Sequence, residues 1–229
     1  MFGKFVSLGW FCGTAASMSK YGLRSSAGPV DWCFTELEEL IHLIDTDFEH
    51  FMEKENLEVD KNNPKAFRDV KYKVSSFHDV KEDLETDYEA VHHKYTRRAQ
   101  KFMEQYRSKT PMCFIRAVHN EQEVDYIKNN EQYIDEVIKK YNKKHQLVLL
   151  VPKCFALPES EVFKVFQLQI DKYSGSDEDN LKELFDTNTD FIHWCYANSS
   201  LKGRCANLYW ELKKRIKNRP DKKQQKANE

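Results

Sequence analysis

Long apolar runs are missing from this chain of 229 residues. No segment approaches the ~20 consecutive apolar residues that a membrane-spanning helix needs. The N-terminus lacks the basic stretch and the apolar core of ~7–15 residues that mark a secretory signal. We therefore expect no membrane span and a cytoplasmic location.

Net charge is nearly absent as well. The 36 Lys and Arg residues almost balance the 37 Asp and Glu residues, so the formal net charge is −1 at pH 7. A chain without an overall positive field has no general electrostatic attraction to nucleic acid or to an acidic membrane surface. Hydrophobic residues make up 40% of the chain and charged residues 32%, as in an ordinary globular protein. We expect no nucleic-acid partner.

Metal-binding pairs and glycine-rich phosphate loops are also lacking. The six cysteines are scattered without a CxxC pair, and His92 and His93 are adjacent, whereas a helical metal site needs histidines four residues apart. Neither a GxxxxGK nor a GxGxxG motif is present,. We expect no metal ion, no disulfide framework and no cofactor. Four cysteines lie in or beside apolar segments, as reduced core cysteines do: Cys33, Cys113, Cys154 and Cys195.

Apolar periodicity predicts an α/β fold. Strands are predicted over residues 4–8, 70–77, 112–118, 146–151 and 162–170,. Helices are predicted over residues 13–21, 35–51 (with a capping box between Thr35 and Glu38), 82–108, 121–144, 180–185 and 207–217, with a loop over 53–66,. We expect a mostly parallel central sheet flanked by helices in three layers. Residues 1–218 would form this single domain, and residues 219–229 a disordered, polar and basic tail.

The segment Val6–Ser17 places a cysteine where a strand turns into a helix. The apolar strand ends at Gly9, and small residues follow Cys12. Unpaired backbone N–H groups and the dipole of the following helix favour the thiolate there, and the glycines leave room for a substrate. Cys12 is therefore the candidate nucleophile, with its own N–H and one from the Gly9 turn as oxyanion donors. The alternative is a buried structural cysteine.

Polar residues at other strand ends supply the remaining parts of a thiol site. His78 follows the strand predicted at 70–77 and would act as the base, since ligands bind where the strands of an open α/β sheet end. Asp31 or Asp79 would orient the imidazole; Asp31 is preferred, because adjacent side chains on a strand point apart. The alternatives are a structural or surface role for His78 and capping of the next helix for Asp31.

Arginines and one tryptophan form the candidate binding set. Arg24 and Trp32 lie in a loop of small residues, where a plain connection needs neither. Arg116 lies in an apolar strand, which is typical of a paired or anion-binding arginine. Arg97 and Arg98 are adjacent on a charged helix, where they would bind an anion or be solvated. Trp32 would alternatively fill the core.

The motifs SLGWFC, YGLRSSAGPVDW, FHD, YTRRAQKF and MCFIRAV together resemble the DUF1796 family, whose members are classed by inference as papain-like cysteine peptidases. The resemblance covers about the first half of the chain. It implies Cys12 as nucleophile and His78 as base, while Val30 stands where the family usually has phenylalanine. It also implies that characteristic polar positions of the family are Arg24, Asp31, Trp32, Asp79, Arg97 and Arg116.

The residues and the resemblance predict a thiol-dependent hydrolase or acyl transferase that acts on a small-molecule, peptide or glycan substrate. Papain-like folds place the histidine on an antiparallel sheet, whereas the strand before His78 is predicted in a parallel one. The alternative is a non-catalytic or transferase-like module that binds an anionic glycan or phosphorylated ligand through Arg24, Arg97, Arg98 and Arg116. A purely structural protein is the third hypothesis.

Overall fold

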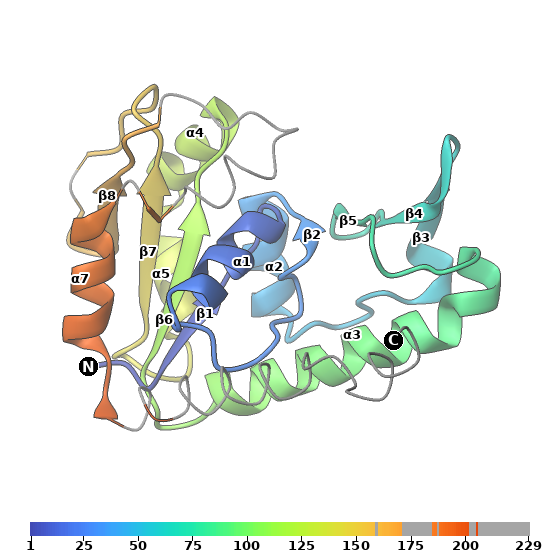
Figure 1. Ribbon diagram of the computed structural model, residues 1–229, viewed down its shortest axis with the longest axis horizontal. Helices are drawn as coiled ribbons and strands as arrows, with labels where there is room; N and C mark the ends of the chain where they lie inside the picture. The colour runs from blue at the N-terminus through green and yellow to red at the C-terminus, as the bar shows by residue number, and fades with distance from the viewer. Residues whose placement is uncertain (159, 171–184, 187, 202–204, 206–229) are drawn as a thin grey trace, which may run out of the picture.

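A parallel four-stranded sheet lies at the centre of the computed structural model (Figure 1), which describes residues 1–158, 160–170, 185–186, 188–201 and 205. Its strands in spatial order are β1 (Lys4–Ser7), β6 (Met112–Ala117), β7 (Gln146–Val151) and β8 (Lys164–Gln167). All three pairings are parallel. The predicted parallel sheet is confirmed, with β8 at one edge.

Helices cover both faces of this sheet. Successive apolar side chains along each strand point to opposite faces, so both faces need to be buried. Cys113, Ile115 and Ala117 pack with apolar residues of α1 (Cys12–Lys20) and α7 (Thr189–Asn198). Met112 and Phe114 point to the other face,. That second face is covered by α2 (Leu37–Asp45), α3 (Leu84–Tyr106), α4 (Glu121–Asn129) and α5 (Glu131–Lys139). The predicted three-layer α/β architecture is confirmed.

A second, antiparallel sheet occupies the other side of the molecule (Figure 1). Its strands in spatial order are β2 (Cys33–Phe34), β5 (Val74–Ser76), β4 (Asn63–Asp69) and β3 (Leu57–Asp60), and the short helix η1 (Lys54–Asn56) precedes β3. The loop predicted over 53–66 is therefore wrong. Strands β3 and β4 form a polar hairpin, in which residues such as Glu58 and Arg68 are exposed. The hairpin therefore lacks the apolar alternation of a half-buried strand.

The strand predicted over 70–77 is shorter than expected. The buried carboxylate of Asp69 accepts hydrogen bonds from the N–H groups of Met52 (2.8 Å), Lys71 (3.0 Å) and Tyr72 (3.2 Å). These bonds stabilise a turn, and β5 begins only at Val74. The alternation that includes Val70 and Tyr72 thus belongs partly to a turn.

The helix boundaries also differ from the sequence prediction. The helix predicted over 35–51 is only α2, and its N-cap residue Glu36 makes no side-chain cap hydrogen bond; Thr35 has other partners, described below. The helix predicted over 121–144 is divided into α4 and α5 at Asn130 (φ −128°), although Asn120 caps α4 as expected. The predicted helix 207–217 and tail 219–229, and residues 180–184, lie outside the described residues.

Helix α3 contacts both sheets along its length (Figure 1). Asp83 caps its N-terminus by accepting from the N–H of Thr86 at 2.9 Å. Tyr95 contacts Phe67 of β4, with ring centroids 6.4 Å apart, while Phe102 contacts Phe114 of β6 at 6.0 Å. Among the described residues no helix is long and apolar enough to cross a membrane.

Candidate active site

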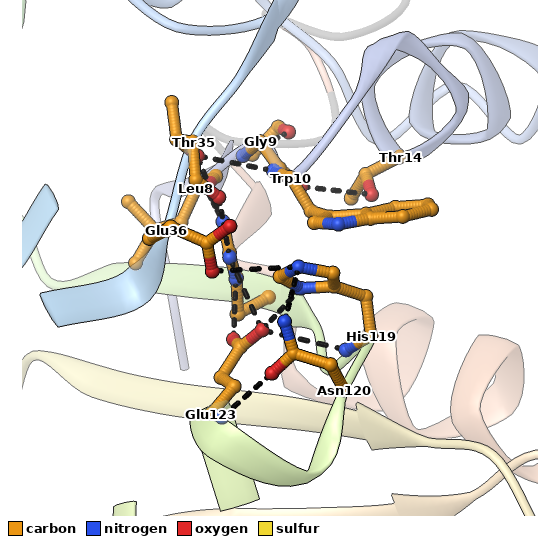
Figure 2. A network of polar contacts seen from close by, with 11 residues as sticks. Leu8, Gly9, Trp10, Thr14, Thr35, Glu36, His119, Asn120 and Glu123 are labelled. Carbon is orange, nitrogen blue, oxygen red and sulfur yellow. Dashed lines mark hydrogen bonds and ion pairs between the residues drawn. The ribbon is translucent and has the colours of Figure 1, made fainter. Parts of the chain in front are cut away.

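The turn between β1 and α1 is held in place by side chains from outside it. Gly9 and Trp10 both adopt positive φ angles, 70° and 73°, a conformation that costs a residue with a Cβ about 1–2 kcal/mol. Trp10 exchanges two hydrogen bonds with Thr35: its N–H donates to Thr35 Oγ1 at 3.3 Å, and its carbonyl accepts from the Thr35 N–H at 3.4 Å. Thr14 Oγ1 donates to the carbonyl of Gly9 at 3.3 Å (Figure 2). Cys12 follows this turn as the first residue of α1.

Cys12 differs from most other cysteines in its surroundings. Cys12 is partly exposed, whereas Cys33, Cys113 and Cys195 are buried. Burial raises the pKa of Cys33 to about 11 and raises the pKa values of Cys113 and Cys195 as well. Cys154 is exposed, so its expected place in the core is wrong. Cys12 is thus a partly accessible thiol at the edge where β1 ends.

The Gly9 turn does not supply the oxyanion donor that the sequence suggested. The N–H of Gly9 donates to Ser7 Oγ at 3.1 Å, and the N–H of Trp10 is bonded to Thr35. Cys12 begins the first turn of α1, and the N-cap residue Phe11 makes no side-chain cap hydrogen bond. Any oxyanion donors near Cys12 therefore belong to the helix rather than to the turn.

His78 is exposed in a bend two residues after β5 ends. Because β5 is antiparallel to β2 and β4, the expectation that a parallel strand precedes this histidine is wrong. The histidine thus follows a strand of an antiparallel sheet. Among the described residues no hydrogen bond or ion pair joins His78 to Cys12, Asp31 or Asp79.

The two candidate acids hold other parts of the fold. Asp79 accepts hydrogen bonds from Ser76 Oγ (3.0 Å), Lys94 Nζ and Tyr95 Oη. Buried Asp31 accepts from the guanidinium of Arg24 and from the N–H of Gly28 at 2.6 Å. Asp31 does not cap α2, since Glu36 is the residue at that position. Asp79 thus fixes the bend that carries His78, and Asp31 fixes the loop that carries Arg24. Neither carboxylate hydrogen-bonds to the imidazole of His78.

Comparison with known proteins places the chain in a family. A family model described as "Putative papain-like cysteine peptidase (DUF1796)" matches residues 3–152. The chain belongs to the DUF1796 family. "Uncharacterized protein R408" of Acanthamoeba polyphaga mimivirus is 26% identical over 135 residues, which cover 49% of this chain and 60% of that protein. The chain therefore spans less than two thirds of that relative, and no solved structure matches it significantly.

Arg116 of this DUF1796 protein is a fully buried structural residue. Its guanidinium donates to Glu123 Oε1 (2.7 Å) and Oε2 (3.2 Å), to the carbonyls of Leu8 (2.9 Å) and Thr35 (2.7 Å), and to Thr35 Oγ1 (2.8 Å). Five contacts match the five N–H donors of arginine. The sequence predicted either a paired or an anion-binding arginine. In the structure Arg116 is paired, and its guanidinium has no N–H donor left for a ligand.

The other candidate binding residues of the DUF1796 protein lie around Asp31 and α3. Arg24 is buried, and its guanidinium lies 5.7 Å from the ring centroid of the half-buried Trp32. Arg97 is exposed, whereas the Nη1 of half-buried Arg98 is buried without a hydrogen-bond partner in the described chain. Burial lowers the pKa of Arg98, and nearby Asp31 opposes that shift. Arg24 and Arg98 thus both lie near Asp31.

The sequence analysis missed a polar network beside the Cys12 turn. His119 Nδ1 lies 2.5 Å from Glu123 Oε2, and His119 Nε2 lies 3.4 Å from Glu36 Oε2. Figure 2 shows the Trp10 indole lying over this imidazole, and the ring centroids are 4.8 Å apart. Burial lowers the pKa of His119, but the bonds to Glu123 and Glu36 outweigh burial and raise it overall.

The carboxylates of this network carry the opposite shifts. Burial raises the pKa of Glu123, but Arg116 and His119 outweigh burial and lower it overall. The bond to His119 lowers the pKa of Glu36. The strand-end rule applied to His78 also applies to His119, which follows β6, and would have identified it. Within the described part of the chain, no group of three His, Cys, Asp or Glu residues is arranged to hold a metal ion.

Proposed function

We propose that this protein is a thiol-dependent hydrolase or acyl transferase with Cys12 as nucleophile and His78 as general base. The family description supports a thiol hydrolase. The observation that carries the assignment is the position of Cys12, a partly exposed thiol at the first residue of α1. A helix N-terminus there favours the thiolate form.

The arrangement of strands supports the pairing of Cys12 with His78. The turn before Cys12 is bonded to Thr35, which directly follows β2. Strand β2 pairs in turn with β5, with Cys33 opposite Ser76, and His78 follows β5. One two-residue strand therefore links the elements that carry the two residues.

The proposed chemistry is acyl transfer through a thioester. His78 takes the thiol proton, and Cys12 Sγ attacks the carbonyl carbon of a peptide, a small molecule or an acylated glycan. The bond to the leaving nitrogen or oxygen breaks as that atom receives the proton from the imidazolium. Water, or a second acceptor in a transferase, then attacks the thioester and releases Cys12.

Asp31 and Asp79 are proposed as positioning residues. Asp79 ties the bend that carries His78 to α3 through Lys94 and Tyr95. Asp31 ties the loop after α1 together through Arg24 and Gly28. Since neither carboxylate bonds His78, their effect on the reaction would come through the backbone that they hold.

The test is the rate at which iodoacetamide alkylates individual cysteines, read by peptide mass spectrometry. Exposed Cys154 serves as an internal reference for an ordinary thiol. We expect Cys12 to react at least about tenfold faster than Cys154 at pH 7, and His78→Ala to remove most of that advantage. His93→Ala, an exposed histidine on α3, is the matched control. Equal rates at Cys12 and Cys154 in the wild-type protein would contradict the proposal.

A second function is favoured by the unpartnered buried nitrogen of Arg98. Burial, together with the charges of neighbouring Arg98 and Arg97, lowers the pKa of Lys94 to about 8, so positive charges lie close together on this part of α3. A phosphorylated ligand or an anionic glycan bound beside Arg24 and Arg98 would supply an acceptor for the Nη1 of Arg98,. Inorganic phosphate should then bind to a Cys12→Ser variant, and Arg98→Gln should abolish binding while Arg97→Gln retains it. Equal loss in both arginine variants, or no binding at all, would contradict this function.

A further inference from the structure

Three aromatic rings form a continuous row beside the candidate active site. The ring centroids of Trp10 and Phe34 lie 6.1 Å apart, and those of Phe34 and Phe77 lie 5.3 Å apart. Phe34 is 42% exposed and Phe77 is 43% exposed. Phenylalanine is more often buried, so two touching exposed rings are an apolar surface that a ligand would cover.

The row connects the two residues proposed to catalyse the reaction. Trp10 lies two positions before Cys12, and Phe77 directly precedes His78. Phe34 lies between them on β2, opposite Ser75 of β5. An acyl group that reaches Cys12 and His78 together would therefore lie alongside these rings.

The row is held in place by the fold. Trp10 contacts His119 on one side and Phe11 on another, with centroids 4.8 and 4.1 Å apart. Phe34 is fixed by the pairing of β2 with β5. A preformed apolar surface loses little conformational entropy when it binds a substrate.

We propose that Trp10, Phe34 and Phe77 form a subsite that binds a large apolar side chain, preferably aromatic, next to the reacting carbonyl of a peptide substrate. This inference rests on the proposed function. The two ring contacts are edge-on, with planes inclined at 71° and 82°, so the row is angular rather than flat. An angular surface suits edge-to-face contact with an aromatic side chain better than stacking of a sugar ring.

A hollow in the surface lies beside Phe77. A hollow of about 240 Å³ is lined by Phe77, Ser75, Arg68 and Glu58 on the outer side of the antiparallel sheet. It adjoins the row at Phe77 and carries charges of both signs. A peptide whose apolar side chain contacts the row would find room for its next residues there.

The experiment compares two irreversible peptidyl chloromethyl ketones, one with phenylalanine and one with glycine beside the reactive ketone. In each, Cys12 Sγ attacks the methylene carbon and chloride leaves. We expect the phenylalanine probe to alkylate Cys12 at least about tenfold faster in the wild-type protein. The ratio of the two rate constants should fall toward one in Phe34→Ala and in Phe77→Ala. Comparing probes within one variant cancels any general change in thiol reactivity.

Tyr196→Ala on α7 removes an aromatic residue that is 44% exposed on another element and should keep the wild-type ratio. Phe77→Leu, which preserves apolar bulk, should keep an intermediate ratio and serves if Phe34→Ala does not fold. An unchanged ratio in Phe34→Ala and Phe77→Ala, with Cys12 still alkylated faster than Cys154, would overturn the subsite alone. Alkylation of Cys12 no faster than that of Cys154 by either probe would overturn the proposed function itself.

Discussion

The imidazole of His119 lies against the indole of Trp10, with the two ring planes inclined by 33°. His119 follows β6, and Trp10 follows β1, so this contact joins neighbouring strands of the parallel sheet at their C-terminal ends. Glu123 and Glu36 bond the same imidazole. His119 therefore joins the turn that carries Cys12 to two carboxylates.

The first prediction concerns the pH dependence of this contact. The folded protein raises the pKa of His119 above its ordinary value of 6.5 and lowers the pKa values of Glu123 and Glu36 below 4.5. The histidine contribution to stability is full below pH 6.5 and is lost as the pH rises through the raised value. The glutamate contributions are present above pH 4.5 and are lost as the pH falls.

The wild-type protein should therefore exceed His119→Gln in stability most clearly between these two values. We expect a difference in unfolding free energy of about 1–3 kcal/mol near pH 5.5 that shrinks above neutral pH. Urea unfolding of both proteins at pH 5.5 and pH 8.5 measures it, and His93→Gln is the exposed control. A difference that grows with pH would contradict the assignment.

A second prediction concerns the buried pair of Arg116 and Glu123. Removing the carboxylate leaves a guanidinium that is 0% exposed without its charge partner. We expect Glu123→Ala to lower the unfolding free energy by about 3–5 kcal/mol. Glu121→Ala, on an exposed position of the same helix, should change it by less than about 0.5 kcal/mol. Equal effects in urea unfolding would show that the pair is not needed.

A third prediction separates backbone strain from steric contact at two glycines. Gly9 and Gly22 both have positive φ, 70° and 62°. A Cβ at Gly9 would lie 3.1 Å from the carbonyl oxygen of Val30, whereas a Cβ at Gly22 would meet nothing within 4 Å. Gly22→Ala should cost about 1 kcal/mol of unfolding free energy, and Gly9→Ala about 2–3 kcal/mol.

The reactivity of Cys12 gives this third test a functional readout. Because Gly9 belongs to the turn that positions the thiol, its substitution should slow alkylation of Cys12, while Gly22→Ala leaves that rate unchanged. Thermal unfolding and the alkylation rate, measured on the same samples, check both parts. A Gly22→Ala variant as impaired as Gly9→Ala would argue against a role for the contacts with Val30 and Thr35.

A fourth prediction concerns the accessible thiols. The three buried cysteines should not react with a thiol-specific chromogenic reagent in the native state, because their thiols are buried and their pKa values are raised,. The native protein should therefore expose only Cys12, Cys154 and Cys205 to the reagent. All six should react in urea. A reactive Cys33 in the native protein would show that the packing around it opens.

The elements with a strong apolar signal could be predicted from the sequence. Strands β6 and β7 are buried on both faces and read as continuous apolar runs, and the long apolar stripe of α3 fixes its length within two residues at each end,. The antiparallel hairpin could not be predicted, because its outer face is charged and one edge is open to solvent. The pattern of apolar residues along the sequence reveals buried elements, and much of this hairpin is exposed.

The site shows a similar division. Cys12 could be placed at the start of a helix from Gly9 and the small residues around it, since those features act locally. The partners of Arg116 could not be foreseen, because Leu8 and Thr35 lie 108 and 81 residues away in sequence. Thr35 also lost its predicted capping role, since its hydroxyl accepts from Trp10 and Arg116 instead. Hydrogen bonds to residues distant in sequence thus take the place of the predicted capping bond.

The length of α3 has a mechanical consequence for the proposed reaction. A helix of 23 residues measures about 35 Å at 1.5 Å per residue. Near its middle it bonds the loop of His78 through Tyr95 and Asp79, and toward its end Phe102 and Tyr106 pack on β6 of the sheet behind Cys12. In the proposed mechanism α3 therefore bonds the loop of the base and packs on the sheet that carries the nucleophile, and a kink in this helix would shift one relative to the other without altering either residue.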